Sequence, residues 1–106
     1  MSYQDIEASD AEALLQTEGL VVIDTRDVMS RSIGQLPNAK SATDSVIEQL
    51  VERRRKNPPV LVYCYHGNSS RNLCAFLSQL GLKQVYNLVG GWEAWQQRPV
   101  MERSTG

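Results

Sequence analysis

The sequence predicts an α/β fold in which a small, mostly parallel sheet is flanked by helices on both faces. Residues 20–23 and 60–63 are continuous apolar runs of strand length, and a strand that is apolar on both faces is covered on both faces. Segments with helical spacing of apolar residues separate these runs. Such alternation is typical of a parallel sheet. We expect strands over residues 3–6, 20–23, 39–41, 60–63 and 84–88.

The sequence also indicates the ends of five helical segments. Ser9 and Glu12 have the spacing of a capping box, which predicts that a first helix begins at Ser9 and stops at Gly19. The other helices are expected to begin at Asp27 or Ser30, at Thr43 or Ser45, after the loop of residues 64–70, and at Trp92. They are expected to end, in the same order, at Ile33, in the basic run 53–56 ahead of two prolines, at Gly81 and at Gln97. The tail from Arg98 has no periodicity and is expected to be loosely attached.

The size and charge of the chain restrict the class of protein. Its 106 residues, 42% of them hydrophobic and 22% charged, predict one globular domain over residues 1–106. A net charge of −1 argues against nucleic acid or an anionic membrane as a partner. No apolar run approaches the length of a membrane span, and the polar, acidic start MSYQDIEASD is unlike a secretory signal.

The cysteine and histidine content indicates a compartment and argues against a metal site. Two cysteines in a chain without a secretory signal predict free thiols in the cytoplasm. One histidine and two cysteines are too few for a zinc site built from protein ligands alone. We therefore expect neither a metal nor a cofactor.

The stretch from Val60 to Arg71 is the candidate functional centre. It starts as an apolar strand, ends that strand in Cys64, continues through six small or polar residues and enters a helix near Arg71. Loop N–H groups and those of the first helical turn then point back toward the sulfur and stabilise an anion there. This arrangement predicts a cysteine with a lowered pKa that acts as a nucleophile. The alternative is a cysteine that is only a small buried hydrophobe.

Four short motifs carry a resemblance to a known family. Residues 64–70, CYHGNSS, resemble the active-site loop of rhodanese-type sulfurtransferases, above all the short, single-domain thiosulfate sulfurtransferases of the GlpE type. Asp24-Thr25-Arg26 matches the family's D-x-R motif, and residues 88–95 match its closing G-G-x-x-x-W element. Residues 34–39 match G-H-I-P-G-A, except that Gln35 replaces the usual His and Asn38 the usual Gly. The four motifs follow one another in the family's order over almost the whole chain.

The resemblance implies a rhodanese-like fold and thiosulfate sulfurtransferase activity. Sulfane sulfur would pass from thiosulfate, through a persulfide on Cys64, to a thiophilic acceptor. The acceptor would be cyanide in an assay, and a small dithiol or a thioredoxin-like protein in the cell. An ionised cysteine needs no general base for this chemistry. The rival function is non-enzymatic: a persulfide carrier, or a rhodanese-like module that docks a protein. We expect a monomer or weak dimer.

The remaining loop residues are expected to bind the substrate and the persulfide. Gly67 permits the backbone angles of an inward turn of N–H groups, whereas Tyr65, His66 and Asn68 are expected to point outward and frame the entrance. His66 is the single histidine, and a direct proton-transfer role for it stays open. Ser69 and Ser70 either donate hydrogen bonds to the persulfide or cap the following helix.

Charged residues and a second thiol lie near the loop. Arg71 is either a cation for the dianionic substrate or a solvated residue of the first helical turn. It is the seventh residue after Cys64, one position later than the arginine of the C-x5-R motif of cysteine phosphatases, so a phosphate monoesterase is disfavoured. Asp24 and Arg26 are expected to form a supporting ion pair, and Cys74 to be a packed core thiol.

Overall fold

A five-stranded sheet forms the centre of the structure, a computed structural model that describes residues 3–98. The strand order is β1-β5-β4-β2-β3, and every neighbouring pair is parallel. The predicted α/β class with a mostly parallel sheet is therefore confirmed. The strands are β1 (Gln4–Ile6), β2 (Val21–Asp24), β3 (Lys40–Ser41), β4 (Val60–Tyr63) and β5 (Val85–Leu88).

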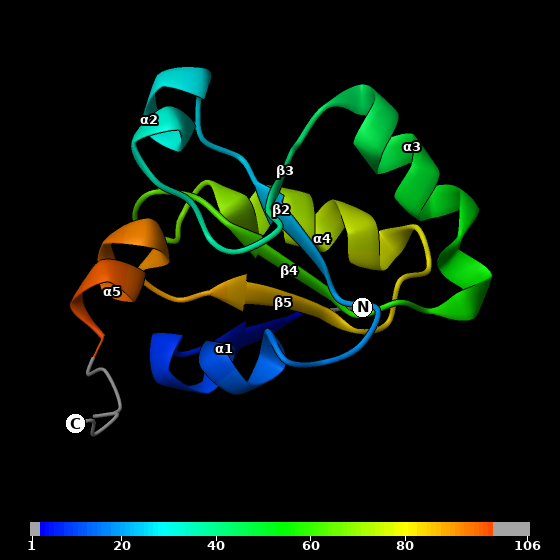
Figure 1. The fold of residues 1–106 in the computed structure, drawn as a ribbon. Coiled ribbons are helices and arrows are strands. Elements are labelled where there is room, and N and C mark those ends of the chain that lie inside the picture. Colours follow the sequence, from blue (N-terminus) through cyan, green and yellow to red (C-terminus); the bar gives the residue numbers. More distant parts are fainter. Residues whose placement is uncertain (1–2, 99–106) are drawn as a thin grey trace.

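Helices cover both faces of this sheet (Figure 1). Helices α1 (Ala8–Leu14) and α5 (Gly91–Gln97) pack on one face, and α3 (Asp44–Glu52) and α4 (Ser70–Gln79) pack on the other. The 3-10 turn η1 (Arg54–Lys56) follows α3. The short helix α2 (Val28–Ile33) follows β2 and so lies at the edge where the parallel strands end.

The neighbouring inner strands β2 and β4 explain the continuous apolar runs of the sequence. All four residues of β2 and all four of β4 are buried. Successive side chains contribute alternately to the two hydrophobic clusters, since neighbouring residues of a strand face opposite sides. Val60 and Val62 belong to the cluster under α3 and α4, whereas Leu61 and Tyr63 belong to the cluster under α1 and α5.

The predicted capping box at Ser9 is wrong. Helix α1 begins at Ala8. Its N-cap residue is Glu7, two positions before the predicted cap Ser9, and Glu7 makes no side-chain capping bond. Ala8 is buried in the core, so packing against the sheet determines where the helix begins. Its end also differs, because α1 stops at Leu14 and turns then lead to Gly19, which adopts the left-handed conformation with φ +83°.

Two open choices of helix start are settled by side-chain caps. The Asp27 carboxylate accepts a hydrogen bond from the Ser30 N–H at 2.8 Å and caps α2. The Thr43 hydroxyl accepts one from the Val46 N–H at 3.2 Å and caps α3. Such a cap contributes about 1 kcal/mol to helix stability. Helix α4 stops at Gln79, just before the predicted Gly81.

Arg98 is the last residue of the chain that the structure describes. Its Nε donates a hydrogen bond to Glu12 Oε2 at 2.7 Å, and its guanidinium lies 3.6 Å from the Trp95 ring centroid. Arg98 is therefore attached to α1 and α5, unlike the predicted loose tail, whose residues 99–106 lie outside the described part. Within residues 3–98, no helix combines the length and apolar character that crossing a membrane requires.

Candidate active site

The candidate site lies where β2 and β4 end side by side. These strands pair in parallel, and Asp24 is opposite Tyr63 in the register. The segment after β2 and the loop after β4 therefore leave the sheet at the same edge. Ligands of open α/β sheets bind at this carboxyl edge. The fold thus brings Cys64, at the end of β4, next to the Asp24–Arg26 motif.

Cys64 lies in a cradle of hydrogen-bond donors. Its thiol is buried, with 4% of the residue exposed. The N–H groups of Gly67 and Ser70 point at the sulfur, with N–Sγ distances of 3.0 and 3.4 Å. The Ser70 hydroxyl oxygen lies 3.3 Å from the same sulfur. The predicted nest of donors around the thiol is therefore present.

The loop conformation requires glycine at position 67. Gly67 has φ +91°, in the region that side-chain-bearing residues rarely adopt. A Cβ atom added to it would lie 2.5 Å from the backbone nitrogen of Gly90 and 3.0 Å from the carbonyl oxygen of Leu88. Any side chain here would push the loop, and with it the Gly67 N–H, away from its present position.

The cradle lowers the pKa of the Cys64 thiol. Burial alone raises this pKa, but hydrogen bonds from the Ser69 and Ser70 hydroxyls and from the Ser70 and Gly67 N–H groups outweigh burial and lower it from 9.0 to about 7. About half of the Cys64 population is then ionised at neutral pH. The site can therefore present a nucleophilic thiolate without an adjacent base.

Three side chains of the loop point outward, as predicted. Tyr65, His66 and Asn68 are exposed, whereas Gly67 is buried. Nδ1 of His66 lies 2.9 Å from Glu93 Oε1 on α5, and its ring packs against the tilted Tyr65 ring with centroids 4.6 Å apart. Within the described residues, the side-chain partner of His66 is thus Glu93, and the loop donors surround the thiol instead.

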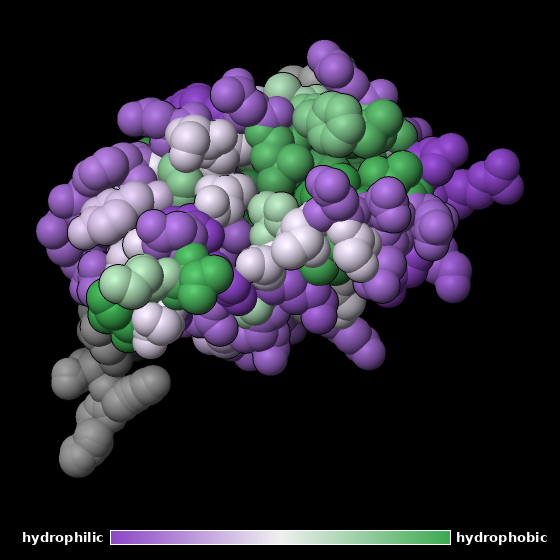
Figure 2. Space-filling view, turned by 90° about the horizontal axis from the view of Figure 1, so that it is seen from above, coloured by the Kyte–Doolittle hydropathy of each residue, from purple (hydrophilic) through white to green (hydrophobic). Residues whose placement is uncertain are grey.

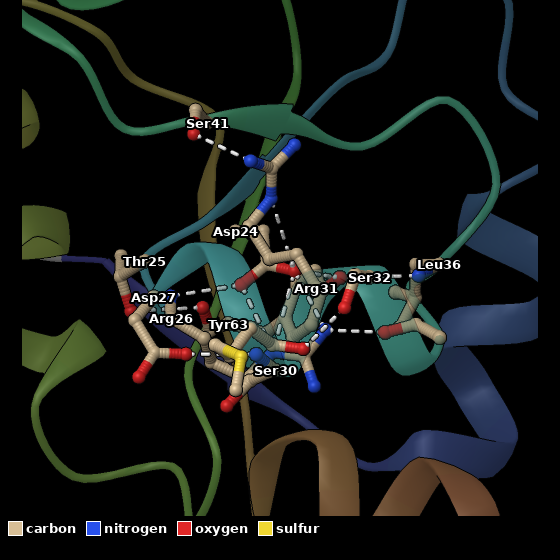
Figure 3. Close-up of polar contacts among 12 residues, drawn as sticks. Asp24, Thr25, Arg26, Asp27, Ser30, Arg31, Ser32, Leu36, Ser41 and Tyr63 are labelled. Atoms are coloured by element: carbon tan, nitrogen blue, oxygen red, sulfur yellow. Dashed lines mark hydrogen bonds and ion pairs between the residues drawn. The ribbon is translucent and has the colours of Figure 1, made fainter.

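A buried ion pair supports the neighbouring strand end (Figure 3). Asp24 is fully buried and accepts hydrogen bonds from Arg26 Nη2 at 2.8 Å and from the Tyr63 hydroxyl at 2.6 Å. Burial raises the pKa of Asp24, but these partners outweigh it and lower the pKa below 3.8. The Arg26 guanidinium also donates to the Gly34 carbonyl at 2.6 Å and lies 4.6 Å from the Trp92 ring centroid. The predicted supporting role of this ion pair agrees with these contacts.

Comparison with known proteins assigns the family. The Rhodanese-like domain family matches residues 7–98. The chain belongs to the rhodanese family. Thiosulfate sulfurtransferase GlpE of Coxiella burnetii is 36% identical over 96 residues, which cover 91% of this chain and 90% of the relative. GlpE of Tolumonas auensis is 36% identical over 91 residues, with 86% of each chain covered.

A solved structure supports the same assignment at the level of the fold. The crystal structure of a rhodanese-related protein from Thermoplasma volcanium matches this chain with a TM-score of 0.69 and 28% identity. The match covers 90% of this chain and 92% of that protein. Asn38, which departs from the family's glycine, has φ 60°. Asparagine tolerates this left-handed conformation better than most residues do, so the departure preserves the turn of the rhodanese fold.

The first turn of α4 in this rhodanese chain lacks a serine cap, one of the two roles that the sequence leaves open for Ser69 and Ser70. Ser69 is the N-cap residue, but its side chain makes no capping hydrogen bond, and Ser70 is already helical. Both hydroxyls act on the Cys64 thiol instead. Arg71 Nη1 lies 3.4 Å from the Tyr3 hydroxyl and 3.5 Å from Asp5 Oδ2 on the β1 side. A substrate-binding role for Arg71 stays a prediction.

Sequence reasoning missed several polar residues of the site. Tyr63 and Arg31 contact Asp24, and Asn87 contacts Ser70. Asp5 in turn accepts a hydrogen bond from Asn87. Asn87 could have been recognised from the sequence, because it is a polar residue inside the otherwise apolar strand β5. Cys74 is fully buried in the core, as predicted. Within residues 3–98, no group of three or more His, Cys, Asp or Glu side chains is arranged to hold a metal ion.

Proposed function

We propose that this rhodanese-like domain is a thiosulfate sulfurtransferase that carries sulfane sulfur as a persulfide on Cys64. The observation that carries the proposal is the buried Cys64 thiol, whose pKa is lowered to about 7 by loop and helix donors. The GlpE relatives, at 36% identity over most of both chains, support the same activity.

In the first step, the Cys64 thiolate attacks the outer sulfur of thiosulfate. The new Cys64 S–S bond forms as the S–S bond of thiosulfate breaks, and sulfite leaves with the electron pair of that bond. Gly67 and Ser70 N–H groups, which lie 3.0 and 3.4 Å from the resting sulfur, then face the persulfide anion. Preorganised donors of this kind stabilise charge as it develops.

In the second step, a nucleophilic acceptor attacks the outer persulfide sulfur and restores the Cys64 thiolate. Cyanide becomes thiocyanate. A dithiol takes the sulfur on one thiolate, and its second thiolate then displaces hydrosulfide as the disulfide forms. Neither step requires a base on the enzyme, which agrees with the pairing of His66 to Glu93. Tyr65, His66, Asn68, Ser69 and Arg71 would then contribute to binding around the entrance.

Exposed apolar side chains near the site favour a protein as the cellular acceptor. On α2, Val28 and Met29 are each 74% exposed and Ile33 is 85% exposed, and Tyr65 of the loop is 46% exposed. Figure 2 shows a hydrophobic group of atoms over α2, separate from the larger one over α3 and α4. Exposed apolar groups of this kind mark interaction surfaces. A thioredoxin-like protein, which presents a dithiol, fits this requirement.

The proposed setting is the cytoplasm, because both cysteines are free thiols and the cycle needs reduced acceptors. A monomer or weak dimer is part of the same proposal.

One experiment separates the enzyme from a carrier or docking module. The protein is incubated with thiosulfate, its intact mass is measured, and cyanide is then added while thiocyanate is followed. A sulfurtransferase gains the mass of one sulfur atom on Cys64 and releases thiocyanate over many turnovers. A protein that loads sulfur but does not turn over is a carrier, and one that never loads sulfur is a docking module. Either result overturns the proposal.

A further inference from the structure

A chain of polar contacts connects Cys64 to Asp5 on the edge strand β1. Asn87 on β5 is completely buried. Its Oδ1 accepts a hydrogen bond from the Ser70 hydroxyl at 2.5 Å, and Ser70 in turn contacts the Cys64 thiol. Its Nδ2 donates to Asp5 Oδ1 at 3.1 Å and to the Gly67 carbonyl at 3.3 Å. Asn87 thus contacts both segments that surround the sulfur.

The partners of Asn87 determine which way its amide points. The Asp5 carboxylate and the Gly67 carbonyl have no proton to donate, so both require the NH2 group of the amide. The amide oxygen is therefore left facing Ser70. A carbonyl oxygen can only accept, so the Ser70 hydroxyl must give its single proton to Asn87. Ser70 then accepts the S–H hydrogen bond of the protonated Cys64.

Ionisation of Cys64 changes this arrangement. A thiolate has no proton to offer and becomes an acceptor for the same Ser70 hydroxyl proton. Two acceptors, the sulfur and Asn87 Oδ1, then compete for one proton. The Ser70 hydroxyl can stabilise the thiolate only by turning away from Asn87.

We propose that Asn87 is a positioning residue that determines whether the Ser70 hydroxyl proton points at Asn87 or at Cys64. Through this choice, Asn87 sets the balance between the thiol and thiolate forms of the cysteine. The inference deepens the proposed function, but its readout below, alkylation of Cys64, does not depend on sulfur transfer. Asn87 acts through Ser70, because its polar atoms contact Ser70, Asp5 and Gly67.

Other charged and titratable groups around the site must be kept constant in a test. Asp5 on β1 is half-exposed and lies 3.5 Å from Arg71 of α4. Cys74 of α4 is buried, and burial raises its pKa to about 12. His66 of the loop pairs with Glu93 of α5. The substitutions chosen below change none of these five groups.

A double-mutant cycle tests the proposal. The pH dependence of Cys64 alkylation by iodoacetamide is measured in the parent, in Asn87→Leu, in Ser70→Ala and in the double variant. Leucine is close to asparagine in size but removes the competing acceptor, so the freed Ser70 hydroxyl donates to the thiolate. Asn87→Leu also loses the hydrogen bonds to the Gly67 carbonyl and to Asp5. Both losses occur equally with and without the Ser70 hydroxyl.

The expected result is a dependence of the Asn87 effect on Ser70. With Ser70 present, Asn87→Leu should lower the pKa of Cys64 by about one unit more than it does in the Ser70→Ala background, since one charge-assisted hydrogen bond is gained. Equal shifts in the two backgrounds would show that Asn87 only supports the loop and would overturn the proposal.

A second measurement, by NMR, keeps Asn87 in place and observes its side chain directly. The side-chain amide resonances of Asn87 are followed by NMR as pH is raised through the ionisation of Cys64. They are expected to shift with the midpoint found by alkylation, and to lose this shift in Ser70→Ala. Asn87 resonances that stay constant through the titration would refute the competition for the Ser70 proton, even if Asn87→Leu does not fold.

Discussion

Replacing Gly67 by alanine is expected to raise the pKa of Cys64 from about 7 toward that of a free thiol. The added methyl group would lie 2.5 Å from the Gly90 nitrogen and 3.0 Å from the Leu88 oxygen. Both are backbone atoms that a side-chain rotation cannot move, so Gly67 itself must shift. Its N–H, now 3.0 Å from Cys64 Sγ, then leaves the cradle.

The size of the effect follows from the loss of this one donor. A hydrogen bond to a charged group contributes about 1.5–3 kcal/mol, and one pKa unit corresponds to about 1.36 kcal/mol. Loss of the Gly67 N–H should therefore raise the pKa of Cys64 by about one to two units. The assay is the rate of iodoacetamide alkylation against pH. Cys74 does not interfere, because burial raises its pKa to about 12.

Two control variants make this test specific. Gly19 has a similar left-handed φ of +83°, but a Cβ added there meets nothing within 4 Å. Gly19→Ala therefore introduces comparable backbone strain far from the site and should leave the Cys64 pKa unchanged. His66→Ala should also leave it unchanged. A folded Gly67→Ala that keeps the pKa near 7, or a His66→Ala that raises it, would refute the backbone account, and the latter would indicate a Cys–His pair.

Three further predictions concern the chemistry and the supporting ion pair. Cys64→Ser should abolish thiocyanate formation from thiosulfate and cyanide while Cys74→Ser keeps most of it, and equal loss in two folded variants would instead indicate a dithiol mechanism. An aryl phosphate should not be hydrolysed, because Arg71 is one position beyond the C-x5-R register; phosphate release that depends on Cys64, without thiocyanate formation, would contradict this. Asp24→Asn should destabilise the fold by about 3 kcal/mol in urea unfolding, since it leaves the buried Arg26 guanidinium without its counter-charge. Because the folded-state pKa of Asp24 is lowered, its stabilisation is present above the unfolded pKa and is lost as pH falls through the folded value. The unfolding midpoint of the parent should therefore fall with acid more steeply than that of Asp24→Asn, and parallel pH profiles would argue against this role.

Much of the fold could be predicted because the determining signals are local. Residues 21–23 of the first apolar run and all of residues 60–63 are buried, and a continuous apolar run predicts this burial directly. Asp27 and Thr43 cap their helices through bonds to residues three positions later, so the partners lie within one motif. The capping box at Ser9 has the same kind of local pattern, yet the packing of Ala8 against the sheet overrides it.

The proposed nucleophile could be predicted from the sequence alone, because Cys64 and its donors Gly67 and Ser70 lie within one segment of seven residues. Strand, loop and helix follow one another there. The geometry of the cradle is therefore a property of a short segment and needs no knowledge of distant contacts.

Only the tertiary structure decided what surrounds that loop. Tyr63 reaches Asp24 across 39 positions of the chain, and Asn87 reaches Asp5 across 82. These contacts depend on which strands are neighbours and on the register between them. The sequence pattern of a single strand gives no information on either. The sequence shows that Asn87 is a polar residue in an apolar strand, but it does not show which residues that strand faces. Asn87 comes to face Ser70 and Gly67 because the order β1-β5-β4-β2-β3 puts β5 between β1 and β4.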